Sequence, residues 1–248
     1  MSAVDLPDTE VSSFTVDQMK ANFVSVAAHQ LRTSLAATKW TLNMLLNGDL
    51  GSLNDEQRAF LSKAYESNAR MIALLADILL SDQIDAGKLK SSGIAVNLPD
   101  LIDSVLVEIR LLGNMHHISI DFVQSGAAIP PVHIDPQQMR AVLQNLLENA
   151  VKYSNPHDMV QVSIEHRPDY VAIVVKDQGI GIPSEQQKDI FNRFFRASNA
   201  IQVEAEGFGL GLCIVKNIVE QNRGTISFTS TENEGSTFRV ELPTSSVV

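Results

Sequence analysis

The chain has 248 residues, 44% of them hydrophobic, which allows one large domain or two modest domains that each bury a core. Its formal net charge of −10 argues against a nucleic-acid partner, because a phosphate backbone would be repelled. The single cysteine, Cys213, excludes an internal disulfide and lies in an apolar run typical of a core position. No apolar run approaches the roughly 20 residues of a membrane span, and the start is polar and acidic. We therefore expect a cytoplasmic chain, or the cytoplasmic part of a larger protein, without membrane contact.

Residues 1–15 have the composition of a linker or tail, and residues 16–92 that of a helical domain. A run from Thr15 to Asn47 contains no glycine or proline, and a second helical run extends from Asn54 to Leu89. The first run carries apolar or small residues at alternating intervals of four and three, a heptad seam formed by Val24, Ala28, Leu31, Leu35, Thr38, Leu42 and Leu45. Two long helices joined by a short loop predict an antiparallel hairpin.

Two helices alone cannot bury both of their apolar faces. A second copy of the chain solves this problem by completing a dimeric four-helix bundle, which we favour. The alternative is a hairpin that packs against its own C-terminal domain.

The pattern changes after about Ser91, and residues 93–248 mix strand-like and helix-like runs. Alternating or β-rich runs occur at Ile118–Gln124, Val160–Glu165, Tyr170–Lys176, Thr225–Thr229 and Ser236–Leu242. Helical patterns occur at Pro99–Leu112, Pro136–Tyr153 and Leu210–Gln221. Together these runs predict an α+β sandwich.

The predicted helix Pro136–Tyr153 carries polar side chains suited to a nucleotide. Asn145 and Asn149 are four residues apart and therefore share one face, with Lys152 and Tyr153 one turn later. Amide oxygens suit Mg²⁺, a lysine suits a phosphate, and an aromatic ring suits a base. These four residues alone would equally fit an ordinary polar helix face.

Two glycine motifs follow. Asp177 ends a strand run and precedes Gly179 and Gly181, so a carboxylate and an open backbone can face a ligand. Gly207, Gly209 and Gly211 open the last helix, where backbone N–H groups and the helix dipole favour phosphate. The sequence before them, Ala197–Glu206, is polar, and we expect a mobile loop that closes over bound nucleotide.

In this order the three motifs resemble the ATP-binding domain of the GHKL, or Bergerat, superfamily. Its N box would be Asn145 to Asn149, its G1 box Asp177 to Gly181, and its G2 box Gly207 to Gly211 with Leu210 between the last two glycines. The run from Phe191 to Arg196, which contains Phe195, resembles the F box of the histidine-kinase branch. Residues 235–238 (Gly-Ser-Thr-Phe) resemble its last glycine motif.

The resemblance implies an α/β sandwich of the Bergerat type and assigns roles to these residues. Asn149 would ligate Mg²⁺, Asn145 would assist at the phosphates of ATP, and Lys152 would contact phosphate. Tyr153 would lie by the adenine, whose amino group Asp177 would hold. In the ATPase branches the first N-box residue is a glutamate that activates water. Here Asn145 is a poor proton acceptor, so slow hydrolysis and a different phosphate acceptor are expected.

The run from Phe23 to Leu35 (FVSVAAHQLRTSL) resembles the H box of the HisKA dimerisation domain. The resemblance makes His29 the phosphoacceptor, attacking phosphorus through a ring nitrogen. Gln30 replaces the family's acidic residue, which orients the histidine, so autophosphorylation is expected to be slower. Ser34 replaces a proline that bends the helix. Thr33 matches the family position that helps to dephosphorylate the partner.

These resemblances cover residues 16–243 and imply a sensor histidine kinase core. A homodimer would use Mg·ATP to phosphorylate His29, then pass the phosphoryl group to an aspartate of a response-regulator receiver domain. Two alternatives remain open. One is a GHKL-type ATPase whose output is its conformational cycle, and the other is a non-catalytic dimerisation scaffold, a degenerate kinase.

Overall fold

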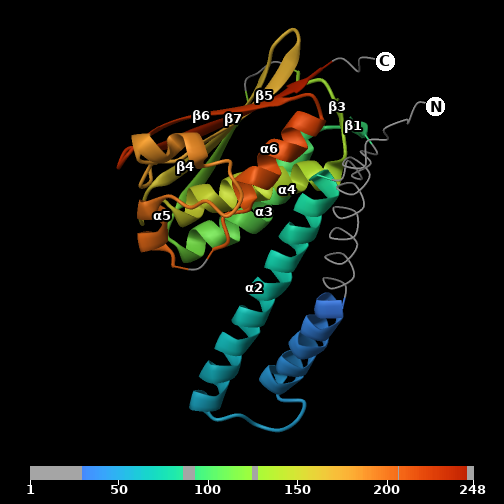
Figure 1. Ribbon diagram of the computed structural model, residues 1–248, viewed down its shortest axis with the longest axis vertical. Helices are drawn as coiled ribbons and strands as arrows, with labels where there is room; N and C mark the ends of the chain where they lie inside the picture. The colour runs from blue at the N-terminus through green and yellow to red at the C-terminus, as the bar shows by residue number, and fades with distance from the viewer. Residues whose placement is uncertain (1–29, 86–92, 125–127, 206, 245–248) are drawn as a thin grey trace, which may run out of the picture. The chain divides into compact units, whose positions relative to one another are not determined.

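The computed structural model describes residues 30–85, 93–124, 128–205 and 207–244 of the chain (Figure 1). It divides into two units, Met1–Leu89 and Lys90–Val248, which are treated separately below. The predicted domain boundary near residue 92 adjoins the 86–92 segment, and the predicted tail 1–15 and His29 also lie outside the described residues. No helix in the described ranges has both the length and the apolar character that crossing a bilayer requires.

The first unit contains a helix over residues 30–47 and helix α2, Asp55–Asp85. The turn between them uses Gly48 at φ +84° and Gly51 at φ +117°, a region of φ that glycine enters without steric cost. The start of α2 is fixed by a reciprocal pair: Gln57 N–H donates to Asn54 Oδ1 at 2.8 Å and Asn54 N–H to Gln57 Oε1 at 3.0 Å. The predicted hairpin is confirmed within the described residues.

Helix α2 carries two apolar seams rather than one. The seam that is partly or fully buried, with spacings of four and three, consists of Leu61, Tyr65, Asn68, Ile72 and Leu75. Lys39 on the first helix lies 5.6 Å from the Tyr65 ring centroid and so links this seam to its neighbour. The other seam, Phe60, Ala64, Ser67 and Met71, is exposed. The seam from Phe60 to Met71 therefore lacks a covering surface among the described residues of the unit.

The second unit is built on a five-stranded sheet in the order β2-β4-β5-β7-β6. Its strands are β2 (Ser119–Gln124), β4 (Met159–His166), β5 (Tyr170–Lys176), β6 (Thr225–Thr231) and β7 (Gly235–Pro243). β2 pairs with β4 in parallel, and the other neighbours are antiparallel. Two short strands, β1 (Ile94–Val96) and β3 (Val132–Ile134), form a separate antiparallel pair.

Three long helices cover one face of this sheet (Figure 1): α3 (Leu98–Met115), α4 (Pro136–Lys152) and α6 (Gly211–Gln221). Their inward side chains form the core, and Cys213 lies buried among them as expected. The opposite face of the sheet is polar. There Arg239 pairs with Glu241 at 2.8 Å and Glu165 at 3.7 Å and lies over the ring of Tyr170. The layers form the predicted sandwich with one core.

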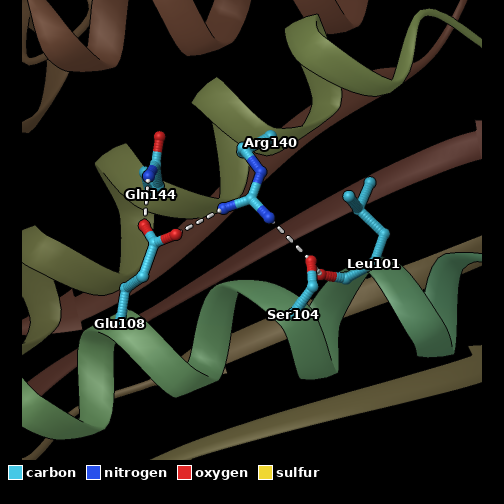
Figure 2. A network of polar contacts seen from close by, with 5 residues as sticks. All are labelled: Leu101, Ser104, Glu108, Arg140 and Gln144. Atoms are coloured by element: carbon cyan, nitrogen blue, oxygen red, sulfur yellow. Dashed lines mark hydrogen bonds and ion pairs between the residues drawn. The ribbon is translucent and has the colours of Figure 1, made fainter.

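A polar network joins α3 to α4 along their outer side (Figure 2). Arg140 donates to Glu108 at 3.1 Å and to Ser104 at 2.9 Å, and Gln144 donates to the other oxygen of Glu108 at 3.0 Å. Each end of the Glu108 carboxylate thus holds a different turn of α4. The network fixes the position of α4, the helix that carries the predicted N box, along α3.

The predicted strands and helices of this unit agree with the structure to within a few residues, but the predicted loop at 197–206 does not. Helix α5 (Ser198–Val203) lies within it. A helix this short leaves most of its carbonyl groups without intrahelical partners. The guanidinium of Arg196 fills that role by donating to the carbonyls of Ala200, Glu204 and Ala205. The sequence pattern missed α5 because the helix is short and its end is stabilised by a side chain that lies outside it.

Candidate functional site

The predicted N box and G2 box meet at one point of the second unit. Asn145 lies on α4, where its amide nitrogen donates to the Ala141 carbonyl at 2.9 Å. Its Oδ1 faces the α-carbon of Gly211, the first residue of α6, so closely that a Cβ at residue 211 would collide with it. The amide of Asn145 and the N-terminus of α6 are therefore adjacent, and glycine at 211 is required for that approach.

The G1 box closes against the C-terminal end of α4. Ile180 N–H donates to the carbonyl of Tyr153 at 3.0 Å, and a Cβ on Gly179 would collide with the same carbonyl. Gly181, at φ +60°, packs its α-carbon against the backbone of Thr231 in the β6–β7 turn. The turn from 177 to 181 is thus held between two backbone segments that only glycine lets approach.

Asp177 lies between these motifs and is 7% exposed. Its Oδ1 accepts hydrogen bonds from the N–H groups of Gly179 and Ser236, both at 3.0 Å. Burial raises the pKa of Asp177, and the charge of Asp158 raises it further, while the two backbone hydrogen bonds oppose the rise. Among the described residues no hydrogen bond to Oδ2 is present, so this oxygen can accept a hydrogen bond from a ligand.

The F box packs backbone to backbone on the G2 box. Phe194 N–H donates to the Gly209 carbonyl at 3.0 Å, and Gly209, at φ +67°, would collide with the Phe195 carbonyl if it carried a Cβ. Leu210 is buried and precedes α6. The half-buried Phe195 and the glycines therefore set the position of the α6 N-terminus, where anions are favoured.

Arg196 and α5 form a segment beside this N-terminus. The guanidinium of Arg196 donates to the carbonyls of Ala205 at 3.0 Å, Gly207 at 3.3 Å and Ala200 at 3.3 Å, and also to that of Glu204. From α5, Asn199 donates to the carbonyls of Ile180 and Gly181 at 3.3 and 2.9 Å. The segment is thus tied to both the F box and the G1 turn.

Lys152 ends α4 and lies next to Tyr153, its Nζ 5.8 Å from the ring centroid. The same ammonium group is 3.8 Å from Oε2 of Glu204, the residue that follows α5. Lys152 therefore contacts the end of the α5 segment through Glu204.

Contacts within the second unit thus link the predicted N, G1, F and G2 boxes. The remaining three predicted site residues, His29, Gln30 and Thr33, belong to the first unit. Gln30 and Thr33 lie exposed at the start of the described helix, and Ser34 donates its hydroxyl to the Gln30 carbonyl at 3.2 Å, where the family proline would bend the helix. His29 lies outside the described residues.

Sequence reasoning gave no individual role to three residues of the site: Ser236, Asn199 and Glu204. Ser236 belongs to the Gly-Ser-Thr-Phe motif and follows Gly235, whose φ of +100° lets β7 begin against the Asp177 carbonyl. Asn199 and Glu204 lie in the stretch expected to be a mobile loop. Their side chains reach the G1 turn and Lys152, both remote in sequence, so no local signal marks these contacts.

The donor set fits a magnesium nucleotide better than a metal held by protein alone. No group of three or more His, Cys, Asp or Glu suited to a metal occurs within the described ranges. Asn149 offers an amide on the same helix face as Asn145, and its side chain makes no hydrogen bond to any described residue. Mg²⁺ commonly takes few protein ligands and completes its shell with substrate phosphates and water. Asn149, one turn after the Asn145 that packs on the first residue of α6, is a single amide ligand of the kind that requirement allows.

Two family models match different parts of this chain. Residues 134–246 match the family described as histidine kinase-, DNA gyrase B- and HSP90-like ATPase. Residues 19–87, which include position 29, match the His Kinase A (phospho-acceptor) domain.

Individual proteins are similar over nearly the whole chain. The circadian input-output histidine kinase CikA of Synechococcus elongatus is 30% identical over 98% of this chain, and the adaptive-response sensory kinase SasA of Synechococcus sp. is 32% identical over 90%. The chain spans 32% of the first relative's length and 59% of the second's. Full-length ShkA in complex with AMPPNP shares the fold, with a TM-score of 0.74 at 24% identity over 90% of this chain and 45% of that one.

Proposed function

Because this chain belongs to the sensor histidine kinase family, we propose that its C-terminal unit binds Mg·ATP and that its N-terminal hairpin carries the phosphoacceptor, His29. The observation that carries the proposal is the convergence of the G1 and G2 motifs on α4. Gly211 packs on Asn145 and Gly179 on the Tyr153 carbonyl, while Asp177 is buried and anchored through Oδ1.

Each part of ATP has a residue suited to it. Oδ2 of Asp177 accepts a hydrogen bond from the adenine amino group, and Tyr153 lies by the base. The N-terminus of α6, with Gly207, Gly209 and Gly211, receives the phosphates. Lys152 neutralises phosphate charge, and Asn145 assists at the phosphates. Arg196 keeps the segment that follows it in place beside them.

Mg²⁺, held through Asn149, would neutralise the charge that develops on the transferred phosphoryl group. No other protein ligand needs to be invoked, since phosphate oxygens and water complete its preferred shell. The residues of this chain position the nucleotide and exclude water.

Residue 145 favours transfer over hydrolysis. An amide has no basic lone pair with which to activate water. The amide nitrogen of Asn145 is also engaged by the Ala141 carbonyl, and its oxygen packs on Gly211. With no general base at this position, the γ-phosphoryl group survives until a stronger nucleophile reaches it.

That nucleophile is the neutral imidazole of His29. A ring-nitrogen lone pair forms the nitrogen–phosphorus bond while the bond from the γ-phosphorus to the ADP oxygen breaks, and ADP leaves. Gln30 orients the imidazole through a hydrogen bond without adding charge. The phosphoryl group then passes to a carboxylate oxygen of an aspartate in a response-regulator receiver domain, which restores His29. In a separate phosphatase reaction, Thr33 would position the water that hydrolyses the aspartyl phosphate of the partner, releasing inorganic phosphate.

The exposed seam of α2 supports a homodimer. Phe60, at 67% exposure, and Met71, at 45%, repeat with the spacing that a second hairpin would bury. A second copy brings an identical seam and closes a four-helix bundle by a two-fold axis.

The decisive experiment is incubation with Mg·[γ-³²P]ATP beside His29→Ala and Asn149→Ala variants. Acid-labile label on the wild-type chain, absent from both variants, is the expected result. Phosphate release without protein label would favour the ATPase alternative. ATP binding without label or release would favour the scaffold.

A further inference from the structure

One ion pair of the second unit joins the phosphate lysine to the segment after the F box. Nζ of Lys152 and Oε2 of Glu204 are 3.8 Å apart, and their side chains are 32% and 38% exposed. The two residues come from the ends of α4 and α5 respectively. The carboxylate therefore lies at the cationic group that the proposed function reserves for nucleotide phosphate.

The position of Glu204 is set by its backbone. The guanidinium of Arg196 donates to the carbonyls of Glu204, Ala200 and Ala205, and Asn199 ties the start of α5 to the carbonyl of Gly181. Both ends of the short helix are thus anchored. The backbone of Glu204 is therefore already ordered when its side chain pairs with Lys152, so the pairing costs side-chain freedom alone.

We propose that Glu204 is a positioning residue that competes with nucleotide phosphate for Lys152, so that phosphate must displace its carboxylate when ATP binds. This inference rests on the proposed function, because it assigns Lys152 to phosphate. A phosphate group carries more negative charge and more acceptor oxygens than a carboxylate, so ATP prevails in the competition. A ligand without phosphate has no means to displace Glu204.

Two consequences follow for the site. Glu204 weakens the binding of ATP and ADP, because their phosphates must displace its carboxylate. It leaves the adenine contact at Asp177 unaffected, so the affinity for adenosine does not depend on it. Displacement also releases the Glu204 side chain from Lys152, which gives this side chain two arrangements that report whether phosphate is bound.

The test is a Glu204→Gln substitution in the whole chain, with ATP, ADP and adenosine titrated by calorimetry. Loss of a partly exposed ion pair that competes with phosphate should tighten ATP and ADP binding about two- to fivefold. Adenosine binding should not change. Glu220→Gln is the matched control, since it removes the same charge from an ion pair of the same 3.8 Å length, between Lys216 and Glu220 on α6.

A double-mutant cycle with Lys152→Gln isolates the pair. In that background Glu204→Gln should leave ATP affinity unchanged. The inference is overturned if Glu204→Gln weakens ATP binding, leaves it unchanged, or tightens adenosine to the same degree. If the wild-type chain binds adenosine and ATP but no label reaches His29, the proposed transfer fails while the competition at Lys152 stands. Absence of any ATP binding would overturn both.

Discussion

The two units of the chain differ in how fully each buries its own apolar residues. In the second unit large helical side chains such as Leu98, Leu143 and Ile214 are completely buried in the core. In the hairpin Trp40 and Phe60 are 66% and 67% exposed, and α2 presents one seam outward. The second unit therefore encloses a core of its own, although Val107, Leu111 and Met115 on α3 are 71%, 67% and 73% exposed, whereas the exposed seam of the hairpin needs another surface.

The units also differ in how closely backbone segments pack within each of them. Gly181 sits at φ +60° with its α-carbon against the Thr231 carbonyl, while Gly51 in the hairpin turn has a positive φ but open space around it. The nucleotide-binding unit depends on close backbone contacts, and the hairpin depends on side-chain seams. Four substitutions or conditions test this contrast.

The largest effect is expected from Gly181→Ala. The new methyl group would meet the Thr231 carbonyl in a strained backbone region, so the nucleotide-binding unit should lose about 3–5 kcal/mol of stability and its affinity for ATP. The hairpin should be unaffected. Gly51→Ala is the control, with strain alone and a cost of about 1–2 kcal/mol. Calorimetric melting would resolve the two units, and equal shifts for both variants would contradict the contrast.

Next in size is Phe60→Asp, which places a charge on the exposed seam. Burying that charge against a second copy should weaken the dimer by about 2 kcal/mol or more, beyond tenfold in its dissociation constant. Light scattering across a dilution series measures the effect, and ATP binding should persist. Ala73→Asp puts the same charge on the opposite, exposed face of α2 and should leave the dimer intact. A stable Phe60→Asp dimer would remove this seam from the interface.

A smaller, stabilising effect is expected from Asn68→Leu. Asn68, in the buried seam of α2 between Leu61 and Leu75, is 2% exposed, and neither polar atom of its amide has a hydrogen-bond partner among the described residues. Replacing the amide with an apolar group of similar size should add about 1–2 kcal/mol to hairpin stability. Denaturation followed by Trp40, the single tryptophan, measures it. Lower stability would mean that the amide gains a partner in the assembled dimer.

The smallest effect is one of pH on the adenine contact. Burial raises the pKa of Asp177 above its ordinary value of 3.8, so the native chain takes up this proton at a higher pH than the unfolded chain does. As pH falls through the raised pKa, this carboxyl alone favours the folded state. It also loses the charge that holds the adenine amino group. Adenosine affinity should therefore decline before free carboxyls titrate, and Asp177→Asn should abolish that decline.

Local periodicity accounts for what the sequence could predict. The four-and-three spacing from Leu31 to Leu45 identifies the hairpin because heptads persist regardless of tertiary surroundings. The strand Tyr170–Lys176 is predicted to the residue, since its β-branched run ends at Asp177 and a glycine turn. The four-residue interval between Asn145 and Asn149 is by itself enough to put both residues on one helix face.

Contacts between distant segments account for the rest. Three-residue strands such as β1 and β3 carry too little pattern to be recognised alone. The N–H of Ser236 reaches Asp177 across 59 positions of sequence. The role of Glu204 depends on Lys152, which lies far earlier in the chain. That relation leaves no mark in neighbouring residues.

The hydrogen bonds from Arg196 to main-chain carbonyls have a consequence for which substitutions the stretch from 198 to 205 tolerates. The Arg196 guanidinium binds main-chain oxygens, which every amino acid possesses, so the contacts survive when the side chains of Ala200 or Ala205 change. Positions such as 200 and 205 can thus acquire new side chains without losing their place, whereas Asn199 holds α5 to the G1 turn through its own side chain. A protein engineer who wished to alter the response of this site to nucleotide would begin at those positions, and would keep Arg196 and Asn199.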